Sequence, residues 1–145
     1  FKEVFLVIGF LTALAVAVFV MLDPAKRFRD TRNARRMTDI QDILSAVYAS
    51  ADHADGTFPA AITSTEKQIG TATIGCAIAT GGCAVAGATD CIDLSTALGN
   101  FLEDVPVDPN GTTALTGYSI VKDADGVVTD RACDAEGGMT VMTRR

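Results

Sequence analysis

The chain has 145 residues, enough for one domain with a terminal extension, and 48% of them are hydrophobic. Its formal net charge of −6 is unevenly spread: residues 90–136 hold ten acids and two bases, whereas residues 23–36 hold six bases and two acids. No basic patch interleaved with aromatic residues occurs in the globular part, so no direct nucleic-acid site is evident. A single histidine, the absence of a phosphate-binding loop and the lack of a nucleophile with its base argue against an enzyme, and we expect no cofactor.

The chain begins with an apolar stretch. Val4–Leu22 contains no charged residue, and Thr12 is its only polar side chain. As a helix these 19 residues would span roughly 29 Å, about the thickness of a membrane's hydrocarbon core. We therefore assign residues 1–24 to a hydrophobic, membrane-spanning helix. Pro24 cannot donate a helical hydrogen bond, so we expect lost or stretched bonds within residues 16–24.

The helical pattern continues from residue 25 to residue 53, but it becomes amphipathic. Its apolar side chains recur at spacings that place them on one stripe of a helix. These residues are Phe28, Met37, Ile40, Leu44, Val47 and Ala51. Gly56 is a typical residue to end such a helix, and His53 lies in its last turn.

The rest of the chain predicts short elements that cover this stripe. Residues 54–92 read as a long irregular loop with a possible short strand near 67–70, and residues 93–103 as a short helix. Antiparallel strands follow within residues 117–143, with candidates at 117–122, 127–133 and 139–143. The predicted fold class is therefore α+β. One long N-terminal helix packs against a small antiparallel sheet, and residues 25–145 form the head.

The four cysteines all follow the apolar segment, at Cys76, Cys83, Cys91 and Cys133. An even number after a membrane-type N-terminus predicts two disulfides in an oxidising compartment outside the cytoplasm. Their spacings lack the short intervals of zinc sites. We favour the pairs Cys76–Cys83 and Cys91–Cys133, which would tie down residues 54–92 and the C-terminal strands. Cys76–Cys91 with Cys83–Cys133 is the alternative.

Glu3 decides how the apolar segment is interpreted. A cleaved signal peptide is disfavoured, because Lys2 is followed at once by an acid and the apolar run is longer than usual. A simple membrane anchor explains the length of the segment. It does not explain Glu3, since a carboxylate inside the edge of an apolar run is costly in lipid and needs a partner.

The chain as a whole resembles a bacterial type IV pilin in outline, most strongly over residues 1–52. The resemblance rests on Phe-x-Glu ahead of an apolar helix, Pro24 just after it, a long amphipathic helix and a cysteine-bearing head, together with the turn Pro106–Pro109. It implies cleavage by a prepilin peptidase and N-methylation of Phe1. Pilins carry the glutamate at the fifth mature position, whereas it is third here, and Lys2 replaces a usually apolar residue. Either the mature N-terminus lies two residues upstream or this is a shortened variant.

The same resemblance implies what the protein does. We expect a structural subunit that leaves the inner membrane through the pilus assembly machinery and polymerises with copies of itself into an extracellular filament on the bacterial surface. Adhesion, motility or DNA uptake would be its role. In the filament, Glu3 would neutralise the N-terminal amine of a neighbouring subunit. The alternatives are a type II secretion pseudopilin or minor pilin, and a monomeric membrane-anchored binding domain.

Two charged groups remain to be interpreted. A basic block follows Pro24, and it is either a set of intersubunit ion-pair partners or a solvated helix face. Its members are Lys26, Arg27, Arg29, Arg32, Arg35 and Arg36. A weak candidate for calcium binding consists of Asp123, Asp125 and Asp130, because their spacing is similar to the start of a calcium-binding loop. The bidentate glutamate of such a loop is missing, so a plain turn is favoured and no metal is predicted.

Overall fold

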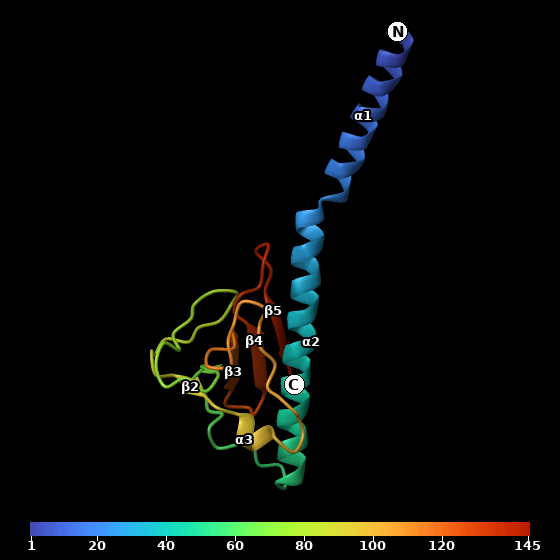
Figure 1. Ribbon diagram of the computed structural model, residues 1–145. Helices are drawn as coiled ribbons and strands as arrows, with labels where there is room; N and C mark the ends of the chain where they lie inside the picture. The colour runs from blue at the N-terminus through green and yellow to red at the C-terminus, as the bar shows by residue number, and fades with distance from the viewer.

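The computed structural model describes all residues, 1–145, and has an extended shape (Figure 1). Helix α1 (Lys2–Leu22) projects away from the rest of the chain, and helix α2 (Pro24–His53) continues from it after a bend. The lower part of α2 lies against a five-stranded sheet. The predicted α+β fold, a long helix packed on a small and mostly antiparallel sheet, is confirmed.

The sheet has the strand order β2-β1-β3-β4-β5. Its strands are β1 (Lys67–Ile69), β2 (Cys91–Ile92), β3 (Tyr118–Lys122), β4 (Val128–Ala132) and β5 (Val141–Arg144). Strands β1 and β2 pair in parallel, and all other pairs are antiparallel. The three C-terminal strands lie where the alternating pattern predicted them, although β5 begins two residues later than expected.

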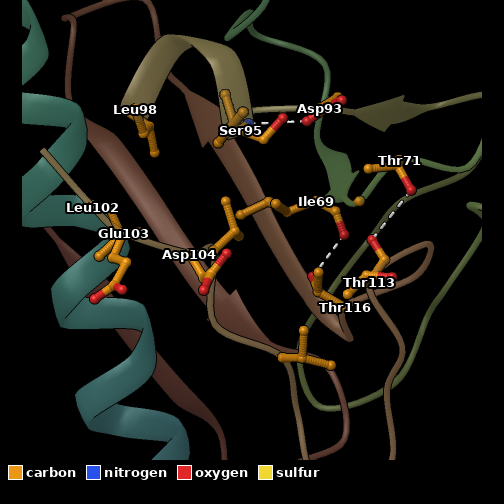
Figure 2. Close-up of a pocket in the computed structure, with 14 residues that line it drawn as sticks. Ile69, Thr71, Asp93, Ser95, Leu98, Leu102, Glu103, Asp104, Thr113 and Thr116 are labelled. Atoms are coloured by element: carbon orange, nitrogen blue, oxygen red, sulfur yellow. Dashed lines mark hydrogen bonds between the residues drawn. The ribbon is translucent and has the colours of Figure 1, made fainter. Parts of the chain in front are cut away.

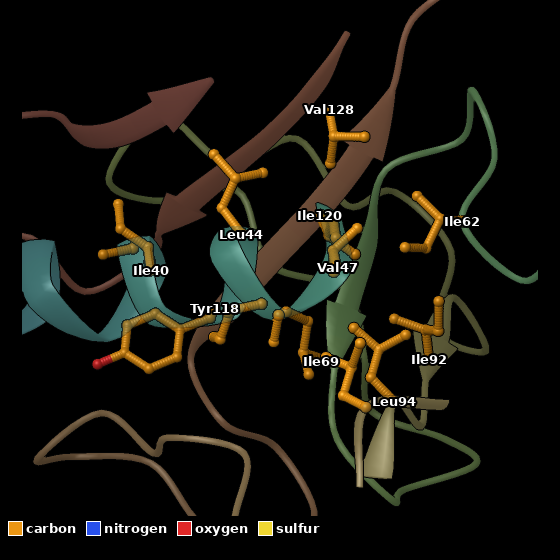
Figure 3. Packing of buried hydrophobic residues seen from close by; sticks show 14 of the residues in the cluster. Ile40, Leu44, Val47, Ile62, Ile69, Ile92, Leu94, Tyr118, Ile120 and Val128 are labelled. Carbon is orange, nitrogen blue, oxygen red and sulfur yellow. The ribbon is translucent and has the colours of Figure 1, made fainter. Parts of the chain in front are cut away.

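The core lies between α2 and one face of the sheet. Figure 3 shows Ile40, Leu44 and Val47 of α2 against side chains from the sheet such as Ile120 and Val128. Most of the predicted stripe is buried or half-buried. Phe28 is the exception, with 66% of its surface exposed, because it precedes the turns of α2 that the head covers. A helical period therefore identifies one face of α2 but not where along the helix that face is covered.

The end of α2 follows the expected chemistry. Gly56 has φ +82° and its N–H donates to the carbonyl oxygen of Ala51 at 2.8 Å. Asp55, with φ 52°, is the left-handed residue directly after the helix cap, a position that glycine more often holds, and Gly56 follows it to complete the turn. His53, in that turn, lies 5.1 Å from Phe101 between ring centres.

The short helix is smaller than predicted. Residues 93–103 contain only the four-residue helix α3 (Ser95–Leu98), and turns follow it. Asp93 lies before it and accepts a hydrogen bond from the backbone N–H of Ser95 at 2.9 Å. Leu94 and Leu98 are buried, and Phe101 and Leu102 pack half-buried against the core from the turns after α3, so the inward-facing side chains lie where they were predicted although the helix is shorter. A four-residue helix with Gly99 at its end cannot propagate far, because short helices gain few hydrogen bonds for the entropy they lose.

Candidate functional site

Helix α1 presents an unpartnered apolar surface. None of its 21 residues is buried, and its large side chains stand 46% to 86% exposed. It is the part of the chain that is long and apolar enough to cross a membrane. Such a surface is stable only in lipid or against other protein.

The charged start of α1 is also unpartnered. Phe1 precedes the first turn, and Glu3 lies in that turn with its side chain exposed. No ion pair joins Glu3 to the N-terminal amine or to Lys2 within the chain. Any partner for Glu3 must therefore come from outside this molecule.

The break between the helices lies at Asp23, immediately before Pro24. Asp23 is left-handed, with φ 33° and ψ 73°, and it ends α1 while its carboxylate accepts the backbone N–H of Lys26 at 3.1 Å. Proline disfavours the helical conformation for the residue before it and is well suited to the first turn of the next helix. Pro24 thus starts α2, and the residue before it absorbs the bend.

The head contains a buried charge cluster on α2. Arg36 is fully buried, and its guanidinium forms a two-pronged ion pair with Asp108, which has no exposed side-chain surface. The same guanidinium donates to Asn33 at 3.0 Å and to Glu136 at 3.2 Å. This cluster ties the turn around residue 108 and the loop before β5 to one level of α2.

Arg32 extends the cluster to the surface. Its Nε donates to Oε1 of Glu136 at 2.6 Å, and the backbone carbonyl of Glu136 accepts from Asn33 at 3.0 Å. Hydrogen bonds from Arg32, with that of Arg36, lower the pKa of Glu136 to about 2. Glu136 is therefore ionised at physiological pH, the state in which it pairs with both arginines.

These contacts correct the assignment of the basic block. Arg32 and Arg36 are held by acids of their own subunit, and Arg35 lies 3.8 Å from Asp39 one turn along α2. Arg36 is therefore not an intersubunit candidate, because it is fully buried with its partners, whereas Arg32 and Arg35, with 40% and 63% of their side-chain surface exposed, stay candidates. Lys26, Arg27 and Arg29 are exposed and form no ion pair.

All four cysteines are disulfide-bonded, but the favoured pairing was wrong. The bonds are Cys76–Cys91 and Cys83–Cys133, which is the alternative pairing. Ile78 and Val85 pair in an antiparallel bridge, and the N–H of Cys83 donates to Thr80. In this register Cys76 and Cys83 do not lie opposite each other, so a local bond between them is not possible without rearrangement.

The three calcium candidates do not form a site. Asp123 and Asp125 lie in the exposed turn between β3 and β4, where Asp123 accepts the N–H groups of Asp125 at 3.0 Å and Val127 at 2.9 Å. Asp130 lies instead in the core, and no cluster of three potential ligands exists. Its carboxylate is fully buried without a hydrogen-bond partner, and burial raises the pKa of Asp130 well above its usual value.

Sequence reasoning missed a pocket beside α3 (Figure 2). It has a volume of about 500 Å³, in the range of ligand-sized pockets. Ile69, Leu98 and Leu102 contribute to its apolar lining, and Glu103 and Asp104 lie on the segment that follows α3. Nothing in the sequence indicated this cavity, because its lining comes from segments far apart along the chain, such as Ile69, Leu98 and Thr113.

Comparison of the chain with protein-family models, curated proteins and solved structures gives no match. Its function must therefore be argued from its own residues.

Proposed function

We propose that this chain is the structural subunit of a type IV pilus, a filament in which the α1 helices of many copies pack together and the heads form the outer surface. The exposed surface of α1 carries this proposal. A 21-residue apolar helix with no buried residue extends beyond a head that has its own core. Such a helix must be covered by lipid or by protein.

The composition of α1 suits both environments. Helices associate in lipid through close packing of small side chains, because lipid tails are as apolar as leucine. Gly9, Ala13 and Ala17 recur every fourth residue of α1, and all three are exposed. The same apolar residues would therefore hold the subunit in the inner membrane and afterwards form the core of the filament.

Glu3 distinguishes a polymerising helix from an anchor. A lone carboxylate at the start of an apolar helix needs a cation when it leaves water. The N-terminal amine of a neighbouring copy, at the positive end of its helix dipole, is such a cation. The amine of Phe1 would carry the methyl group that the pilin resemblance implies, after cleavage by a prepilin peptidase.

The head suits an exported, load-bearing subunit. Two disulfides tie the irregular loops to one another and to the end of β4, and the cluster around Arg36 fixes the turn at Asp108 and the loop before β5 to α2. Disulfides of this kind persist in oxidising compartments outside the cytoplasm. We propose that the assembly machinery draws the subunit from the inner membrane onto the cell surface.

The test is electron microscopy of cells that make the chain together with a type IV pilus assembly system. We expect long surface filaments that an antibody against the head decorates. Short periplasmic assemblies would instead favour a type II secretion pseudopilin. A detergent-solubilised protein that never self-associates would favour a monomeric anchored domain and overturn the proposal.

Replacing Glu3 tests the intersubunit contact. We expect Glu3→Ala to leave the head folded and the subunit in the membrane but to reduce filament yield by tenfold or more, because a charged pair in an apolar surrounding loses its partner. Lys2→Ala is the control, since it changes an adjacent exposed charge and should leave the yield nearly unchanged. Normal filament yield with Glu3→Ala would contradict the role of Glu3.

A further inference from the structure

The start of α2 carries an aromatic residue between cations. Phe28 is 66% exposed and lies between Arg27 and Arg29, which form no ion pair in the chain. Phe58, Phe101 and the tyrosines of the head are at least half-buried. Aromatic residues and arginine are the types enriched at the centres of protein interfaces. Arg27, Phe28 and Arg29 therefore have the composition of a surface that contacts another protein.

The pocket beside α3 has the complementary composition. Of its 14 lining residues 6 are hydrophobic, Leu98, Leu102 and Val105 among them, and Asp93, Glu103 and Asp104 are its charged residues. No basic residue lines it, and none of these three acids forms an ion pair within the chain. Hydrogen bonds from the hydroxyl and N–H of Ser95 lower the pKa of Asp93, so it remains charged. The pocket thus suits an apolar ring flanked by cations.

Phe28 and the pocket beside α3 lie too far apart to meet within one molecule. The hydroxyl of Ser50 on α2 lies 3.5 Å from the carbonyl oxygen of Ala97 on α3, so the pocket is close to the level of Ser50. Phe28 lies 22 residues nearer the N-terminus on the same helix, a separation of roughly 33 Å at 1.5 Å per residue. A second copy shifted by about that distance along α2 would bring its own pocket level with Phe28 of the first.

We propose that Phe28 of one subunit enters the pocket beside α3 of a neighbouring copy, where Arg27 and Arg29 pair with Glu103 and Asp104. The docking rests on the proposed polymerisation, and it identifies which surfaces of the heads meet. The ring replaces water on the apolar lining, and the ion pairs fix the axial offset between copies. The basic surface at Arg27 and Arg29 thereby contacts the acidic surface at Glu103 and Asp104, outside the filament core that the α1 helices would form.

Photo-crosslinking tests the docking directly. Phe28 is replaced by the photoreactive amino acid p-benzoylphenylalanine in the full chain, filaments are irradiated, and mass spectrometry locates the linked peptide. We expect a link to residues 93–107 of a second copy. The same reagent at Met142, a residue 38% exposed in β5 that does not line the pocket, is the control and should give no such link. Links from position 28 only to other regions would overturn the docking.

Charge reversal provides an independent test. Arg27→Glu with Arg29→Glu, or Glu103→Arg with Asp104→Arg, should lower filament yield about tenfold or more, because like charges would then face each other across the contact. Combining the two pairs should restore most of the yield. All four positions are exposed, and resistance of the head to protease checks that each variant is folded.

The controls reverse one exposed base and one exposed acid outside the proposed contact, Arg144→Glu in β5 and Asp125→Arg in the β3–β4 turn, and should leave the yield unchanged. If the wild type forms filaments and both charge-reversed variants form them with the same yield, the docking is overturned and the proposed function stays intact. Absence of wild-type filaments and oligomers would overturn both.

Discussion

Arg36 and Asp108 form the most completely buried ion pair of the head, with no exposed side-chain surface on either residue. Removing one partner leaves an uncompensated buried charge, which is more damaging than replacing the whole pair. We expect Arg36→Met to lower the free energy of unfolding by about 3–5 kcal/mol. Urea unfolding of the full chain in detergent micelles, followed by circular dichroism, measures the change.

Arg35→Met is the matched control for that measurement. Arg35 occupies the adjacent position on α2, but its side chain is 63% exposed and lies 3.8 Å from Asp39. An exposed pair one helical turn apart contributes about 0.3–0.5 kcal/mol. Equal losses for the two variants would mean that Arg36 is not held in a buried pair.

Asp130 makes the stability of the head depend on pH. Its pKa is raised in the folded chain by burial, so it binds a proton up to a higher pH when folded than when unfolded. Below the unfolded pKa of about 3.9, Asp130 is protonated in both states and does not change the free energy of unfolding. As pH rises above that value, the carboxyl ionises in the unfolded state first, and the free energy of unfolding falls. Asp130→Asn, which is neutral at every pH, should gain stability over the wild type at pH 7 and show a smaller gain at pH 3.

Urea midpoints of the two proteins at both pH values measure this difference. Asp125→Asn is the control, because Asp125 is exposed in the β3–β4 turn. A gain for Asp130→Asn that is the same at pH 3 and pH 7 would show that the Asp130 carboxyl is not buried in a charge-excluding site.

At the scale of elements, the disulfides hold the segments that lack regular structure. Cys83–Cys133 joins the loop after β1 to the end of β4 across 50 residues, whereas Cys76–Cys91 closes 15 residues. The chain-entropy model gives about 4 kcal/mol for the longer loop and about 3 kcal/mol for the shorter one. We expect the Cys83→Ser/Cys133→Ser variant to unfold at a lower urea concentration than Cys76→Ser/Cys91→Ser.

Peptide mapping without reduction provides the covalent check. A linked peptide joining Cys76 to Cys83 would contradict the pairing on which the stability prediction rests. Ser119 adds a local constraint, because its hydroxyl lies 3.1 Å from the sulfur of Cys83 and 2.6 Å from Glu66. The longer disulfide is thus anchored to the centre of the sheet through β3.

At the scale of the whole molecule, the chain has two parts with different surroundings: α1 needs lipid or other protein around it, whereas the head has its own core. Helix α1 has no buried residue, while the core contains only residues from α2 onward. A chain of residues 24–145 should therefore remain folded and behave as a soluble monomer. Size-exclusion chromatography with light scattering, together with circular dichroism, tests this. Loss of the folded sheet on removing α1 would show that the head depends on that helix.

The sequence was informative wherever a property is local. The uncharged run Val4–Leu22, the helical spacing of Ile40, Leu44 and Val47, and the Asp-rich turn between two alternating strands each depend on neighbouring residues. These patterns were sufficient to predict the α+β fold and its layers. They also predicted that α1 needs a partner, since an apolar helix with a single carboxylate is unstable in water.

Contacts between distant residues were decided only by the tertiary structure. In the sequence, Arg36 does not differ from the other five bases of its block. Its partners Asp108 and Glu136 lie 72 and 100 residues further along the chain, and only the fold brings them to it. The disulfide pairing likewise depends on the register of Ile78 with Val85, which composition does not encode. The pocket beside α3 forms only where that helix meets β1 and the following turn. Each of these features needs a long loop to close in one particular way, and loop closure is set by the packing of the whole chain rather than by its local sequence.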